Sequence, residues 1–236
     1  MGILYTAYAD AFTRPNDTTA YSVQDVVGTN LAVTGATNAT PIVITTAAHG
    51  FSTGDVVTIA SVGGNTNANG TFRVTVLSST TFSLDGSAGN AAYTSGGTVA
   101  KWNRIVTAAR PGGSGAIRGW KLATNSANVT SVSFSLAIFK SATTGGQLPP
   151  AATLDNAIIG NNFYTDYRTF IHKTAAASIT AATAGSATGW AEATNLFIPY
   201  DTDGTSSDLW VQVIAEGAFT PVANQTFRLS VDLEKQ

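Results

Sequence analysis

The feature of this sequence that most restricts its fold is an alternation of apolar and polar residues with a period of two. In residues 227–234, FRLSVDLE, every odd-numbered residue is apolar and every even-numbered residue is polar. Residues 132–138, VSFSLAI, follow the same pattern. Successive side chains of a β-strand point to opposite faces of its sheet, so each segment is predicted to be a strand with one buried face.

Helical periodicity is almost absent, and we therefore expect an all-β protein. The Ala-rich stretch 174–189 is the one candidate helix, but its Thr and Gly residues lower helix stability, so a long loop is expected there. Apolar and β-branched segments bounded by turn-forming residues predict the other strands. These are residues 42–46, 54–60, 70–77, 80–84, 97–102, 117–124, 163–171, 195–200 and 208–216.

A change in composition divides the chain. Residues 31–102 are dense in Thr, Asn and Gly, with short strands joined by turn-forming groups such as Gly63-Gly64-Asn65. We expect a β-sandwich formed by residues 1–30 and 103–236, with a small β-barrel domain of residues 31–102 inserted into it. Insertions are tolerated best at surface turns whose two ends lie close together.

Charged side chains are scarce, and this restricts the classes of partner. Lys, Arg, Asp and Glu make up 11% of the residues and the net charge is −2, against about 25% charged residues in a typical domain. Nucleic acids and acidic lipids require concentrated positive charge, which 12 Lys and Arg residues do not supply. No apolar run approaches the length of a membrane helix. We expect neither nucleic acid nor a membrane as a partner.

The residues available for catalysis are few. The sequence contains no cysteine, which excludes thiol nucleophiles, disulfides and thiolate metal sites. Its two histidines, His49 and His172, fall in different predicted domains. We expect His49 to bond to loop backbone, with a ligand or catalytic base as the alternative, and His172 to have a surface or interface role. No cofactor and no enzymatic activity are expected; the alternative is a hydrolase that uses His172 or the acidic turn 201–208.

Two short motifs resemble known sites only in part. Residues 112–115, GGSG, do not complete the Gly-x-Ser-x-Gly pattern of a hydrolase because Ala116 follows, and they are expected to form a tight turn. Asp201, Asp203 and Asp208 form an acidic cluster whose oxygens could converge on calcium. The EF-hand order fails, since the glycine comes too early and no closing Glu is present. A turn is expected, with a calcium site as the alternative.

The tryptophans divide into two groups. Trp102, Trp120 and Trp210 lie in predicted strands and are expected in the core. Trp190, which follows Thr188 and Gly189, is the one expected at the surface. An exposed aromatic face can stack on a sugar ring, so a carbohydrate-binding module is an alternative function.

The N-terminal residues lack the basic start and long apolar segment of a secretory signal, so they are expected to be mature sequence. Their apolar side chains are expected to form an arm that lies on a neighbouring surface or on another chain. An arm of this kind becomes ordered on its partner. Its residues are Ile3, Leu4, Tyr5, Tyr8 and Phe12.

Several motifs outside residues 31–102 resemble a family of tailed-bacteriophage structural proteins of the capsid-decoration, or auxiliary head, type. They are FTRPNDTTAY at 12–21 with QDVV at 24–27, ARPGGSG at 109–115, FSLAIF at 134–139 and LDNA at 154–157.

Residues 39–59, 68–72 and 93–99 are similar to a small barrel that recurs in phage virion proteins. That barrel is named after the first catalytic-cysteine half-domain of ubiquitin-activating enzymes. The likeness implies no thioester chemistry, because this chain has no cysteine.

The resemblance implies a non-enzymatic virion protein on the capsid surface, which binds the major capsid protein and stabilises the shell. It also implies that the protein associates with copies of itself as a homotrimer. The arm residues named above would contribute to the capsid or subunit interface. Trimming residues 1–12 is expected to abolish binding and leave the fold intact. A tail, baseplate or fibre component is one alternative, since the barrel occurs in those proteins too. A carbohydrate-binding module for host adsorption is the other.

Overall fold

A computed structural model describes residues 2–15, 18–107, 112–126, 131–140, 170–178, 180–181, 188–202 and 207–235. These residues are almost entirely β-structure, with a single 3-10 turn, η1 (Thr66–Ala68), which confirms the all-β prediction. They fall into two compact units. One combines the two ends of the chain, up to Val27 and from Asn103 onward, and the other comprises Gly28–Trp102.

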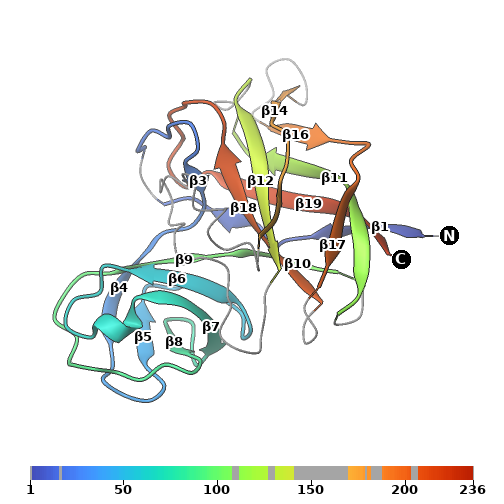
Figure 1. The fold of residues 1–236 in the computed structure, drawn as a ribbon. Coiled ribbons are helices and arrows are strands. Elements are labelled where there is room, and N and C mark those ends of the chain that lie inside the picture. The colour runs from blue at the N-terminus through green and yellow to red at the C-terminus, as the bar shows by residue number, and fades with distance from the viewer. Residues whose placement is uncertain are drawn as a thin grey trace. The chain divides into compact units, whose positions relative to one another are not determined.

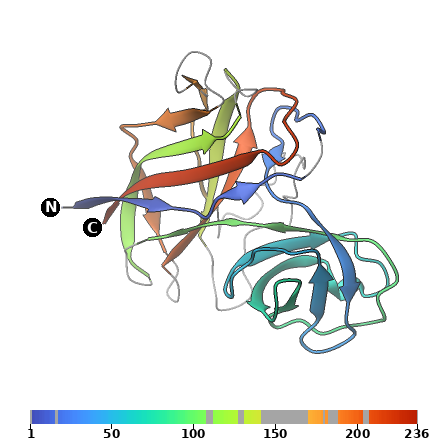
Figure 2. The same ribbon diagram turned by 180° about the vertical axis from the view of Figure 1, so that it is seen from behind.

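The first unit is a sandwich of two antiparallel sheets (Figure 1). The larger, here named the β19 sheet, has the order β1-β19-β11-β16-β15, with β17 also paired to β11 and β2 to β19. Seen from behind, β19 lies between β1 and β11 (Figure 2). The strands are β1 (Ile3–Tyr8), β2 (Phe12–Thr13), β11 (Ser114–Thr124), β15 (Thr180–Ala181), β16 (Gly189–Ala193), β17 (Ile198–Asp201) and β19 (Thr226–Lys235).

The second sheet of the sandwich, here named the β18 sheet, has the order β10-β18-β12-β13, with β14 paired to β12 and β3 to β18. Every residue of β18 is buried, so this strand is covered on both faces, whereas burial alternates along β19. The strands are β3 (Val26–Val27), β10 (Asn103–Val106), β12 (Ser133–Lys140), β13 (Phe170–Lys173), β14 (Ala177–Ser178) and β18 (Asp208–Ala215).

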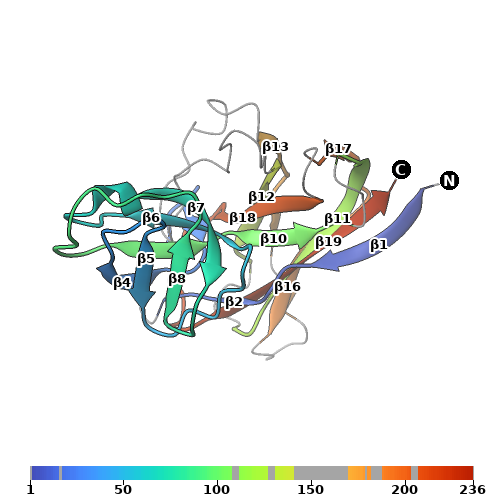
Figure 3. The same cartoon turned by 90° about the horizontal axis from the view of Figure 1, so that it is seen from below.

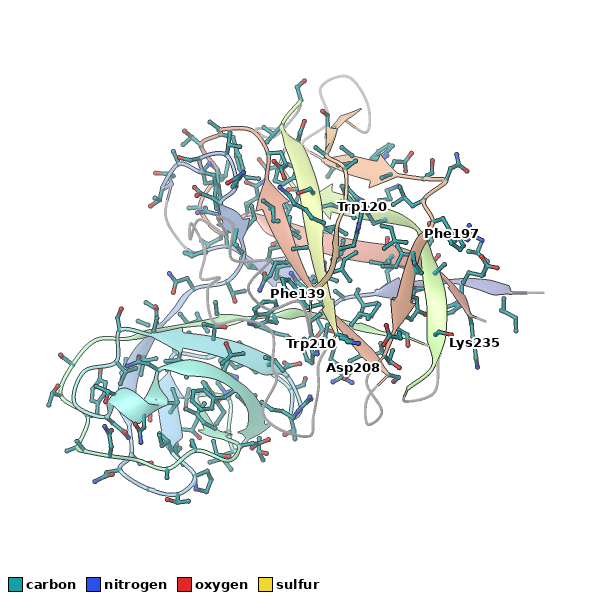
Figure 4. All side chains as sticks on the ribbon, in the orientation of Figure 1. Trp120, Phe139, Phe197, Asp208, Trp210 and Lys235 are labelled. Atoms are coloured by element: carbon teal, nitrogen blue, oxygen red, sulfur yellow. The ribbon has the colours of Figure 1, made fainter. Side chains whose placement is uncertain are left out.

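The core of the first unit lies between these sheets. The apolar alternate residues of β19 meet those of β12, as their period of two predicts. Trp120 of β11 is buried in the same core (Figure 4). The residues from β19 and β12 are Phe227, Leu229, Val231, Leu233, Phe134, Leu136 and Ile138.

The second unit is a closed barrel with the order β4-β5-β8-β7-β6-β9 and a core of its own. Figure 3 shows β5, β8 and β7 side by side. Closure leaves a barrel without sheet edges. The strands are β4 (Leu31–Ala36), β5 (Val43–Thr46), β6 (Val56–Ala60), β7 (Gly70–Val76), β8 (Thr81–Leu84) and β9 (Thr98–Lys101).

The N-terminal segment, expected to be an arm on a neighbouring surface or on another chain, is a strand of the sandwich itself. It forms β1, which is paired along its whole length with β19, from Ile3 opposite Lys235 to Tyr8 opposite Ser230. Phe12 is only 6% exposed and stacks on Phe227 with 5.5 Å between ring centroids. Removing residues 1–12 would uncover β19 and open the core. The expectation that they can be trimmed without harm to the fold is therefore wrong.

One other predicted segment differs in the structure, and several predicted segments fall on residues that the structure does not describe. The segment 174–189, expected to be a loop, contains the short strands β14 and β15. Of the predicted strand 163–171, residues 163–169 are not among those described. The same holds for residues 109–111 and 154–157 of the motifs above.

Candidate binding surfaces on the β19 sheet

The outer face of the β19 sheet carries the side chains that are free to meet a partner. Along β19 the even-numbered residues point away from the core. The ladder with β1 places Leu4 and Tyr8 beside this row, opposite Glu234 and Ser230. Residues paired across strands lie on the same face of a sheet, so register decides which side chains meet there.

An apolar surface at the end of the sheet where β1 begins, here called the apolar edge, consists of Ile3, Leu4 and Phe197, with Ile3 on the opposite face of the sheet from Leu4. These side chains are 67%, 66% and 61% exposed. A hollow of about 590 Å³ has Leu4 and Phe197 among its lining residues. Phe197 is labelled in Figure 4 at the same end of the sheet as Lys235, the ladder partner of Ile3.

Arg118 and Glu234, the charged residues beside Leu4 and Phe197, are paired with each other. A β-bulge between Ile117 and Gly119 takes Arg118 out of the regular register of β11. The Arg118 guanidinium donates to the Glu234 carboxylate. It also stacks on Phe197, with 4.7 Å from Cζ to the ring centroid. The exposed remainder of this surface is therefore mainly apolar.

Strand β1 is at the edge of its sheet. It pairs with β19, and no second strand among the described residues pairs with it. An edge strand presents backbone N–H and C=O groups that have no ladder partner, and another chain can add a strand to it. The exposed Ile3 and Leu4 would lie within such a contact.

The predicted interface residues occupy different environments. Ile3 and Leu4 are both exposed at the apolar edge, on opposite faces of the sheet, while Tyr8 is 75% exposed further along β1. Tyr5 is half-buried against the core, where burial raises the pKa of Tyr200 and the neighbouring Tyr5 hydroxyl raises it further. Phe12 is in the core and cannot contact a partner at the surface.

A second surface, here called the Trp190 groove, is lined by Tyr8, Asp10, Lys121, Ala123, Trp190 and Arg228. It consists of adjoining hollows of about 530 and 500 Å³ that share Lys121, Ala123 and Arg228. Trp190 belongs to one hollow and Tyr8 to the other. The groove therefore has an aromatic side chain in each half and two cations where the halves meet.

The register of three strands explains the groove. Ala123 of β11 is paired with Trp190 of β16 on one side and with Arg228 of β19 on the other. A methyl group thus lies between an indole and a guanidinium, and the difference in size leaves the hollow. Lys121, two residues before Ala123, places its ammonium over the indole, 4.4 Å from the ring centroid.

The two histidines considered as candidates for catalysis have different environments. Nδ1 of His49 accepts the Phe51 N–H at 2.9 Å, and Nε2 lies 3.0 Å from the Ser78 carbonyl oxygen. This confirms that His49 bonds to loop backbone. His172 is exposed on β13, in the other unit.

The acidic turn is described only at its ends. Asp201 accepts a bond from Lys140 at 2.9 Å, and Asp208 pairs with Arg104 at 3.3 Å. Residues 203–206 lie outside the described part of the chain. Within the described part, no cluster of three or more His, Cys, Asp or Glu residues is placed to hold a metal. The same part contains no helix with the length and apolar character needed to cross a bilayer.

The tryptophan predictions are confirmed. Trp102, Trp120 and Trp210 are buried, and Trp190 is partly exposed. Sequence reasoning missed Lys121, Ala123 and Arg228 as neighbours of Trp190. The sequence indicates only that these residues point outward from a strand. It does not show which strands lie beside that strand.

Comparison with known proteins supports the barrel. Residues 38–102 match the family model of the ubiquitin-activating enzyme E1 FCCH domain. No curated protein matches the chain.

Solved structures show only distant likenesses. A cleaved adhesin domain of Lys-gingipain from Porphyromonas gingivalis is 16% identical, with 89% of this chain and 99% of that chain covered and a TM-score of 0.29. The structure of infectious bursal disease virus, Gx strain, is 9% identical, with 99% and 81% covered and a TM-score of 0.13. Both TM-scores are too low to indicate a shared fold.

Proposed function

We propose that the chain is a non-enzymatic structural protein of a tailed-bacteriophage virion, which decorates the capsid as a homotrimer and attaches to the major capsid protein through the apolar edge. The observation that carries this proposal is β1, an edge strand with Ile3 and Leu4 exposed. Exposing these side chains to water does not stabilise the domain. Covering them with a partner removes apolar surface from water and stabilises the complex.

Attachment through β1 has a simple physical basis. A strand of the partner would bond to the free edge of β1, while its side chains cover Leu4 and Phe197. Backbone bonds supply affinity, and the pockets for alternate side chains supply specificity. Apolar burial adds roughly 25 cal/mol per Å². Repetition over a shell, with several attachment points in each trimer, adds multivalency.

The assignment to a phage particle rests on the motifs in the first unit. The FCCH-like barrel of residues 38–102 is compatible with it but does not favour the head over the tail. A tail, baseplate or fibre position is therefore the alternative that a test must separate.

Immunogold labelling of purified particles tests this assignment. An antibody against the chain is expected to label heads over their whole surface. Gold confined to tails or baseplates would replace the capsid with that structure as the partner. Particles that carry no label, and contain no copy of the chain by mass spectrometry, would overturn the proposal.

A further inference from the structure

We propose that the Trp190 groove binds an oligosaccharide that carries carboxylate groups. This binding is independent of attachment through the apolar edge, because the groove is lined by other residues. Three properties of the groove support it: its aromatic side chains, its unpaired cations and its polar rim.

The aromatic side chains match the shape of a short saccharide. Trp190 and Tyr8 lie on strands separated by three inter-strand spacings in the order β16-β11-β19-β1, about 14 Å across the sheet. A sugar ring has an apolar face of C–H groups that packs on an aromatic ring, and hydroxyls at its rim. Ala123 leaves room for sugar units between the two aromatic residues.

Four cations elsewhere in this unit are paired with carboxylates. Arg104, Arg118, Lys140 and Lys173 each form an ion pair.

Lys121 and Arg228 have no ion pair with any residue that the structure describes. Glu192 is the ladder partner of Lys121 but forms no salt bridge with it. Lys235, at the far end of β19, also lacks such a pair. Asp10 is the carboxylate that lines the groove. The Arg228 guanidinium presents a planar set of donors that fits a carboxylate.

Lys121 can serve the ligand as well as the indole. Its ammonium now covers one face of Trp190, in a contact that is weak at an exposed site. The flexible side chain can turn to a carboxylate and leave the indole face to a sugar ring.

Polar side chains complete the Trp190 half of the groove. Asn125, Thr188 and Thr226 line it, and their amide and hydroxyl groups are of the kinds that form hydrogen bonds with sugar hydroxyls. A small inorganic anion would leave the aromatic side chains unused, and a neutral sugar would leave the cations unused. An acidic saccharide uses both.

A panel of oligosaccharides tests the proposal, with uronic-acid or sialic-acid members and neutral counterparts of the same backbone. We expect the chain to bind at least one acidic member about tenfold more tightly than its neutral counterpart. In ¹⁵N–¹H spectra the indole N–H signal of Trp190 should shift, while those of the buried tryptophans should not.

The variants separate the parts of the groove. Arg228→Gln should weaken acidic binding about tenfold, and Trp190→Ala should abolish it. Ala123→Leu keeps both side chains but fills the hollow, and should also abolish binding. Glu192→Gln, on the same strand as Trp190 but outside the hollow, is the control and should not weaken binding. Thermal melting of each variant checks that it is folded.

Several results would overturn the proposal. They are an acidic panel retained no better than the neutral one, unchanged binding by folded Trp190→Ala and Ala123→Leu, or equal competition by inorganic sulfate at the same charge concentration. The last result would show that charge alone is recognised.

Discussion

The two ends of the outer face of the β19 sheet use their charged residues in opposite ways. At the apolar edge, Arg118 is bonded to Glu234, and the exposed side chains beside this pair on the outer face are Leu4 and Phe197. At the Trp190 groove, Lys121 and Arg228 have no carboxylate partner among the described residues. The outer face of this sheet therefore exposes apolar side chains where its charged residues are paired, and a groove with two cations where they are not.

The first prediction tests the buried face on which both surfaces depend. Phe12→Ala removes a ring that stacks on Phe227 in the core, and should lower the free energy of unfolding by about 3–5 kcal/mol. Tyr8→Ala, on the exposed face of the same segment, should change it by less than about 0.5 kcal/mol. Urea denaturation measures both. Equal losses would contradict the placement of these residues.

The second prediction compares the arginines of the two ends. Arg118→Ala should lower the free energy of unfolding by about 0.5–1 kcal/mol, because it loses Glu234 and uncovers Phe197. Arg228→Ala should leave it within about 0.5 kcal/mol of wild type, because no internal pair is lost. The difference should shrink in high salt, which screens the pair. A larger loss for Arg228→Ala would show that this residue has a structural role.

The smallest effect concerns alkaline pH and the core residue Tyr200 of β17, which lies opposite Gly115 of β11. Burial raises the pKa of Tyr200 above its ordinary value of 10.0. The folded state therefore favours the neutral phenol, and its contribution is fully present below pH 10 and decreases above it. Tyr200→Phe should show a smaller loss of stability between neutral and alkaline pH than wild type. An identical pH dependence would contradict this.

Much of the fold could be predicted from the sequence because one-faced strands carry their own signal. The alternation in 227–234 identified β19, and the β-branched segments 70–77 and 80–84 identified β7 and β8. Strand β1 was missed because Ile3, Leu4 and Tyr5 are consecutive apolar residues, without the alternation of a half-buried strand.

The candidate surfaces were less predictable. Trp190 could be placed at the surface from its Thr and Gly neighbours, but Ala123 and Arg228 meet it only through ladders between segments far apart in sequence. These contacts depend on which strands are paired and in which register. The pattern of a single sequence does not give that information. The pairing of Arg118 with Glu234 depends on a β-bulge for the same reason.

The most direct test of the central claim is co-sedimentation of the purified chain with capsid shells assembled without it. Wild type should sediment with the shells. Leu4→Asp should remain in the supernatant, since it places a charge in the proposed contact, while Val222→Asp, at an exposed apolar residue elsewhere in the unit, should sediment like wild type. Failure of wild type to sediment, or equal sedimentation of folded Leu4→Asp, would contradict attachment through β1.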